Sequence, residues 1–165
     1  MITVVDKTVT SNISLSAILN CKTKVDMLKI CRKLDLYVSP NLYKAKTAER
    51  LASEMLYNVD AIYYKLNKNE IQLLGEFIQA GPNQYIVRKA RKMEYMLQKL
   101  CLVVTYIDTE VDEWHMLMPD IVRETLATDF PLYKKMVDNG MAIPSPKELR
   151  FMDFMHDLYG DGEKG

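Results

Sequence analysis

The sequence has little of what marks a secreted, metal-binding or membrane-spanning protein. Its three cysteines include no CxxC pair, so neither a disulfide framework nor a zinc site is indicated, and we expect reduced, mostly buried thiols. It has no run of about 18 apolar residues, which a membrane-spanning helix needs, and its first residues, MITVVDKTV, are too polar for a secretory signal. These absences predict a cytoplasmic protein without a membrane segment.

The sequence also lacks the residue patterns of an active site. It has two histidines, His115 and His156, and no GxSxG, GxxxxGK[ST] or GxGxxG motif. A metal site would need further ligands near His115, and a catalytic serine or cysteine would need a base beside it. We therefore expect a protein that is not an enzyme and that binds neither a metal nor a cofactor.

No excess of one charge marks the chain as a whole, because its 22 basic and 22 acidic residues cancel. A strongly basic balance would by itself have indicated nucleic-acid binding. The charges are nevertheless unevenly placed: residues 1–57 hold nine Lys/Arg and five Asp/Glu, whereas residues 114–165 hold six and nine. The excess of basic residues therefore lies toward the N-terminus and the excess of acids toward the C-terminus.

The most informative pattern runs from Gln84 to Leu100. Apolar residues recur there at spacings of 4, 3, 4 and 3, which predicts one helix with a buried stripe. Arginine can pair with guanine and lysine with phosphate, so a basic opposite face predicts nucleic-acid contacts; the alternative is an ordinary solvated helix face. The side chains on that face are Arg88, Arg91, Lys92, Tyr95 and Lys99.

The elements around this predicted helix follow the order of a winged helix-turn-helix. A helix over Glu70–Ala80, with Asn69 as its cap, precedes a Gly-Pro-Asn break, and strands over 103–107 and 114–118 follow. With the phrase MLQKLCLVV, the stretch resembles winged-helix repressors of the MarR and ArsR kind. The resemblance implies that the 84–100 helix enters the major groove of double-stranded DNA. The turn between the strands, DTEVDE, is acidic, which favours a wing that faces a protein.

An earlier stretch predicts two helices joined by an extended loop. Periodic apolar residues indicate helices over Thr23–Asp35 and Lys46–Tyr57, and Pro40 keeps the loop between them extended. The stretch KVDMLKICRKLDLYVSPNLYKAKTAERLASEML resembles the SAP-like family, which includes the N-terminal domain of the Rho termination factor. The resemblance implies nucleic-acid contacts from the loop and the start of the second helix, at Lys44, Lys46 and Arg50.

The two ends of the chain carry weaker signals. The N-terminal residues ITVV have β character but no obvious partner, and the ranges 121–127, 131–139 and 146–159 each have the apolar spacing of a helix. Most of the methionines stand at positions typical of core filling. The last helix is strongly apolar and could pack on its own chain or on a second copy. We expect a homodimer through the C-terminal helices.

These patterns together predict a mainly α fold with a small β-hairpin. Its expected parts are a SAP-like helical segment (1–57), a winged-helix-like domain (58–120) and a helical C-terminal extension (121–165). We expect a non-enzymatic nucleic-acid-binding or regulatory protein, with double-stranded DNA as its partner. The alternative is a protein–protein interaction or assembly module on a winged-helix scaffold that does not bind DNA. Zero net charge and the acidic turn favour this alternative.

Overall fold

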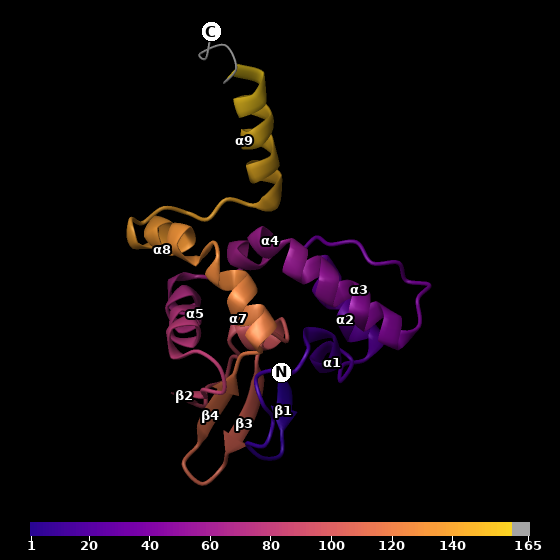
Figure 1. The fold of residues 1–165 in the computed structure, drawn as a ribbon, viewed down its shortest axis with the longest axis vertical. Helices are drawn as coiled ribbons and strands as arrows, with labels where there is room; N and C mark the ends of the chain where they lie inside the picture. Colours follow the sequence, from indigo (N-terminus) through magenta and orange to yellow (C-terminus); the bar gives the residue numbers. More distant parts are fainter. Residues whose placement is uncertain (160–165) are drawn as a thin grey trace.

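The computed structural model describes residues 1–159, in which helices gather at one end of a small sheet (Figure 1). The strands are β1 (Ile2–Val4), β2 (Ile86–Lys89), β3 (Val104–Asp108) and β4 (Glu113–Leu117). The helices are α1 (Leu15–Leu19), α2 (Lys24–Lys33), α3 (Lys44–Tyr57), α4 (Val59–Tyr64), α5 (Lys68–Ala80), α6 (Met96–Lys99), α7 (Asp120–Ala127), α8 (Phe130–Asp138) and α9 (Pro146–Tyr159).

The sheet has the strand order β1–β3–β4–β2. The predicted hairpin, β3 with β4, is confirmed and forms its centre. β2 pairs antiparallel with β4, and β1 pairs parallel with β3, with Ile2 opposite Val104. The N-terminal residues therefore find their partner in a strand far along the chain. About half of the described residues are helical, so the fold combines helices with a four-stranded mixed sheet.

One continuous cluster of buried side chains runs from α1 to α8. Within it, α3 packs on α1 and α2, while α5 packs on α7 and α8. Tyr63 of α4 stacks on Tyr133 of α8, with ring centroids 4.0 Å apart, and donates its hydroxyl to the Leu126 carbonyl at 2.6 Å. The three expected parts of the chain all contribute to this cluster, and their division into domains stays a prediction.

The single helix predicted over residues 84–100 is wrong. Residues 86–89 form β2, residues 90–95 are irregular, and only residues 96–99 are helical. The apolar spacing fits a helix, but β2 instead completes backbone hydrogen bonds with β4, placing Arg88 opposite Trp114. Pairing with a neighbouring strand overrides a local helical pattern of this kind. The recognition helix implied by the winged-helix resemblance is therefore absent from the described chain.

A buried carboxylate determines where the short helix α6 begins. Glu70 of α5 accepts hydrogen bonds from the backbone N–H groups of Met96 at 2.8 Å and Leu97 at 3.4 Å. The first N–H groups of a helix have no partner within the helix, so an acceptor from another element stabilises a start at this position. The contact joins α5 to the residues that follow β2.

The helices predicted on either side of the extended loop are confirmed. Thr23 caps α2, since its hydroxyl accepts from the Asp26 N–H at 3.1 Å, and Tyr43 is the residue before α3. In α5 the predicted cap is wrong: Asn67, and not Asn69, accepts from the Glu70 N–H at 3.0 Å. Gly81 ends α5 as predicted, with a φ of 80° that favours glycine.

The last helix, α9, extends away from the rest of the molecule (Figure 1). Its start is fixed by a reciprocal pair: the Ser145 hydroxyl accepts from the Glu148 N–H at 3.1 Å, and the Glu148 carboxylate accepts from the Ser145 N–H at 3.3 Å. None of its side chains is buried. Within residues 1–159, no helix combines the length and the apolar character needed to cross a membrane.

Candidate functional site

Of the residues predicted to share one helix face, Arg88, Arg91 and Tyr95 line one small hollow beside α5, whereas Lys92 and Lys99 lie apart from it. Arg88, on β2, forms an ion pair with Glu76 of α5, and its other nitrogen donates to the Val87 carbonyl at 3.0 Å. Its side chain is half-buried, so much of its charge is already neutralised within the fold. Lys92 is exposed in the loop that follows β2.

Arg91 and Tyr95 form a compact local cluster. The Arg91 guanidinium lies 3.6 Å from the centroid of the Tyr95 ring, donates to the Met93 carbonyl at 2.8 Å and lies 3.9 Å from Glu70. Tyr95 in turn packs edge-on against Trp114, with centroids 6.2 Å apart. These contacts give both side chains a structural role in joining the loop to α5 and the sheet.

The residues carried over from the SAP-like resemblance lie in the first two turns of α3. Lys44 and Arg50 are exposed, and Lys46 pairs with Glu49 at 3.3 Å. This end of α3 and strand β2 lie on opposite sides of the molecule (Figure 1). Lys44, Lys46 and Arg50 are therefore apart from Arg88.

A larger set of basic side chains, all lysines, converges elsewhere. Lys22, Lys29 and Lys33, on and just before α2, surround a hollow together with Lys99 of α6. Lys33 also lines a second hollow, together with Lys65 at the end of α4 and Lys147 in the first turn of α9. We call the six side chains around these hollows the lysine face: Lys22, Lys29, Lys33, Lys65, Lys99 and Lys147.

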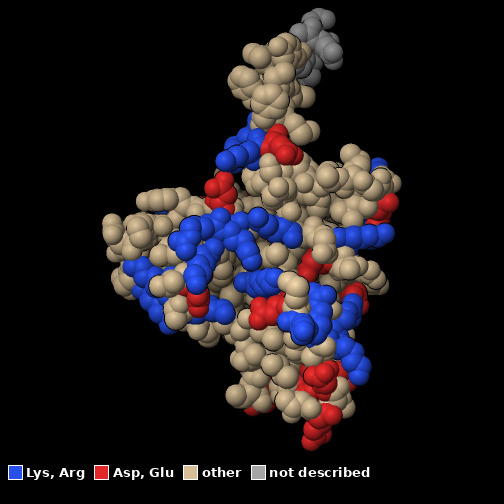
Figure 2. Space-filling view, turned by 180° about the vertical axis from the view of Figure 1, so that it is seen from behind, with Lys and Arg blue, Asp and Glu red and all other residues tan. Residues whose placement is uncertain are grey.

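The positive charge of the lysine face is poorly compensated. Its two hollows contain the carboxylates of Asp26 and Asp35, against six ammonium groups. Among residues 1–159, Lys29 is the only one of the six within 4.0 Å of a carboxylate, that of Asp26. Figure 2 shows a band of basic side chains across the middle of the molecule, and acidic side chains at the tip below it. The face therefore suits an anionic ligand with several charges.

An exposed aromatic side chain lies beside these lysines. Tyr64, at the end of α4, lines the second hollow, and its side chain remains 44% exposed. The Lys65 ammonium lies 5.5 Å from the centroid of its ring. An exposed ring next to cations is the arrangement on which proteins stack the bases of a single strand.

Sequence reasoning identified only Lys99 among the residues of the lysine face. The spacing of four between Lys29 and Lys33 does place both on one side of α2, and this signal was available. Their meeting with Lys99 and Lys147 depends on the packing of α2 against elements far along the chain. No spacing in the sequence reveals that contact.

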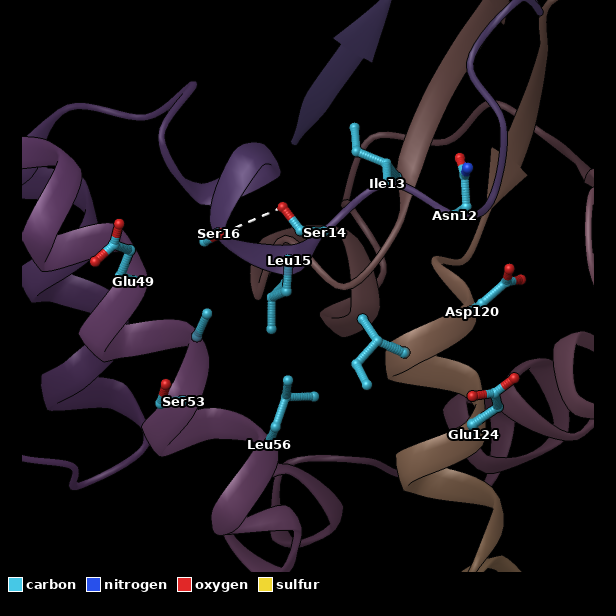
Figure 3. Close-up of a pocket in the computed structure, with 12 residues that line it drawn as sticks. Asn12, Ile13, Ser14, Leu15, Ser16, Glu49, Ser53, Leu56, Asp120 and Glu124 are labelled. Atoms are coloured by element: carbon cyan, nitrogen blue, oxygen red, sulfur yellow. Dashed lines mark hydrogen bonds between the residues drawn. The ribbon is translucent and has the colours of Figure 1, made fainter.

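A groove separate from the lysine face lies between α3 and α7 (Figure 3). Leu15 and Leu56 point into it, Ile121 also lines it, and Glu49, Asp120 and Glu124 stand at its rim. The Ser11 and Arg123 side chains hold the pKa of Asp120 below its usual value. Arg123 lies 2.8 Å from Asp120 and 3.8 Å from Glu124, so this arginine already partners two of the three carboxylates.

The side chains considered for chemistry are apart from these surfaces. His115 lies on β4 with both ring nitrogens lacking a hydrogen-bond partner, beside the edge of Tyr106. Burial raises the pKa values of the Cys31 and Cys101 thiols, which keeps them protonated. In the described part of the chain, no three His, Cys, Asp or Glu side chains come together as metal ligands would.

Comparison with known proteins adds no family to this picture. No protein-family model, no curated protein and no solved structure matches the chain.

Proposed function

We propose that this protein binds nucleic acid through the lysine face, without catalysing a reaction. The observation that carries the proposal is the convergence of six lysines, five of them without an acidic partner among the described residues, around two adjoining hollows. Phosphates are the ligand that such a surface fits, because each contacted phosphate releases condensed counterions. This moves the predicted contacts from the 84–100 segment to α2, α4 and α6.

The dimensions of the face agree with a stretch of phosphate backbone. Lys29 and Lys33 lie one helical turn apart, about 6 Å, along α2, and Lys22 comes just before the start of that helix. Tyr64 stands beside that line and offers a ring for stacking. Contacts of this kind recognise the backbone rather than the base sequence, so the proposal is binding with little sequence preference.

The SAP-like resemblance supplies a second, subordinate surface. The α2–loop–α3 segment has the helix–loop–helix order on which the resemblance was based, and Lys44, Lys46 and Arg50 lie at the start of α3. We propose these three residues as auxiliary contacts. Lys46 is already paired with Glu49, so we expect them to contribute less than the lysine face.

Fluorescence anisotropy with labelled single- and double-stranded oligonucleotides of mixed sequence tests the proposal. With four to six phosphate contacts, we expect log K to fall with log salt at a slope of about −3 to −5. Lys29→Glu/Lys33→Glu should reduce that slope by about 2. The matched control is Lys134→Glu/Lys135→Glu on α8, which changes the net charge equally and should bind like the wild type.

Three results would overturn the proposal. Equal weakening by both double variants would show a general effect of net charge. Loss of binding only in Lys44→Glu/Lys46→Glu would assign binding to the SAP-like surface instead. Absence of binding by the wild type at about 50 mM salt would exclude nucleic acid as the ligand and favour the second candidate.

The second candidate function is a protein–protein interaction or assembly module. The observation that favours it is the exposed apolar surface of α9, where Phe151 is 62% and Phe154 59% exposed. Binding through apolar and aromatic side chains depends much less on salt than binding to phosphates. Salt dependence therefore separates the two candidates for any ligand that is found.

A further inference from the structure

Helix α9 carries an apolar stripe that no other part of the described chain covers. Phe151, Phe154 and Leu158 are 62%, 59% and 57% exposed, and their spacings of three and four place them on one side of the helix. Arg150 and Asp157, seven residues apart, lie together along one edge of this stripe. The helix thus has an apolar centre with one cation and one anion on the same flank.

The base of α9 is held against the rest of the molecule. Pro146 and Lys147, in its first turn, share a hollow with Ala61 and Tyr64 of α4. The reciprocal hydrogen bonds between Ser145 and Glu148 fix the residue at which the helix starts. The apolar stripe is therefore presented on a helix that is already formed, which lowers the entropy lost on association.

We propose that α9 pairs antiparallel with α9 of a second copy of this chain. In the register that we infer, Phe151 packs against the partner's Phe154, and Arg150 faces the partner's Asp157. A two-fold axis repeats each contact, so two ion pairs flank a centre of four phenylalanine rings. In an antiparallel pair, side chains on the same flank of the two helices face each other. One register therefore brings the two apolar stripes together and also places Arg150 opposite Asp157 of the other copy.

Charge favours this arrangement over two competing ones. In a parallel pair, Arg150 would face the partner's Met155, so neither charge would gain a partner. In an antiparallel pair shifted by one heptad, Asp157 would face the partner's Asp157 and the two carboxylates would repel each other. The arrangement in which opposite charges meet is the one that also brings the aromatic side chains together.

The area available fits a dimer that depends on concentration. Side chains of this size bury about 150–250 Å² each when fully covered, so the exposed parts of the stripe and the stems of its flanking residues provide ~500–600 Å² per copy. The total of ~1,000–1,200 Å² lies at the lower limit of specific interfaces. We therefore expect association in the micromolar range.

Sedimentation velocity of the full chain over a range from about 1 to several hundred micromolar measures this association. We expect the wild type to shift from monomer to dimer with concentration. Arg150→Asp and Asp157→Arg should each weaken the dimer by about three- to tenfold, since each places like charges opposite one another. The double variant Arg150→Asp/Asp157→Arg should restore wild-type association, because the pairs are then reversed.

The control for unrelated charge effects is Lys134→Asp/Asp138→Lys, which reverses an ion pair within α8 and should leave the dimer unchanged. Phe151→Glu/Phe154→Glu should leave a monomer at every concentration, with unchanged far-ultraviolet circular dichroism as evidence of folding. A wild type that remains monomeric throughout would overturn the proposal. So would a dimer that the single charge variants weaken but the double variant fails to restore, because α9 would then contact another surface, such as the groove between α3 and α7.

Discussion

Glu70 is a buried acidic side chain that bonds the backbone of another element. Its side chain is 6% exposed, it accepts hydrogen bonds from the Met96 and Leu97 N–H groups, and the Arg91 guanidinium lies 3.9 Å away. Burial raises the pKa of Glu70, while the two N–H donors and Arg91 act in the opposite direction without cancelling the effect of burial. The site thus holds a carboxylate under conditions that disfavour its charge.

This environment predicts how stability varies with pH. Because the pKa of Glu70 is raised in the folded state above its ordinary 4.5, folded protein holds that proton to a higher pH than unfolded protein does. The stability that Glu70 contributes is therefore full below about 4.5 and falls as pH rises through the folded pKa. Urea unfolding of the wild type and Glu70→Gln at several pH values measures it. The free energy of unfolding of the wild type should fall relative to that of the variant as pH rises through this window; a wild type that instead gains stability relative to the variant would contradict the assignment.

Among the elements, α5 and α8 pack so closely that a glycine is needed between them. A Cβ atom added to Gly75 of α5 would lie 2.8 Å from the Phe130 ring of α8, closer than van der Waals contact allows. Alanine favours helix over glycine by about 1 kcal/mol, but overpacking costs about 1–3 kcal/mol. The two effects leave a net cost of about 0–2 kcal/mol, so we expect Gly75→Ala to destabilise the fold by about 1 kcal/mol in urea unfolding. In a Phe130→Leu background the same change should become neutral or stabilising; equal effects in both backgrounds would show that the two side chains do not meet.

The elements also show which parts of the fold follow from local sequence. Periodic apolar residues were sufficient to predict α2, α5 and α9, and β-branched residues to predict β3, although the cap of α5 is Asn67 and not the predicted Asn69. They failed for β2, whose residues fit a helix equally well and become a strand only because β4 offers a hydrogen-bonding edge. The lysine face was missed for a related reason, since Lys99 meets Lys22 and Lys33 through packing of distant elements. Local sequence patterns predict individual helices and strands. Which strands pair, and which side chains share a surface, depends on contacts between residues far apart in the sequence.

At the scale of the whole molecule, the proposed nucleic-acid surface and the proposed dimer contact lie at different positions. The lysine face lies along α2 and meets the base of α9, whereas the apolar stripe lies on the part of α9 that extends outward (Figure 1). An antiparallel pair of α9 helices would therefore join two molecules. In the proposed register Leu158 would lie against Lys147 of the other copy, while the lysines on α2 would stay uncovered. Two such faces on one dimer could bind one long nucleic acid together, and their effective concentration would raise the apparent affinity.

The separation of charge has a consequence for how this neutral protein behaves on charged media. Basic side chains form a band across the middle of the molecule and acidic side chains gather at its tip (Figure 2), where the β3–β4 turn lies (Figure 1), so the molecule is dipolar although its formal charge is zero. Near pH 7 and at low ionic strength, we expect retention on both cation-exchange and anion-exchange resins, each of which selects one orientation of the molecule. Lys29→Glu/Lys33→Glu should elute earlier from the cation exchanger and later from the anion exchanger. A wild type that neither column retains would show that the charge separation is too small to orient the molecule on a charged surface, including that of a polyanion.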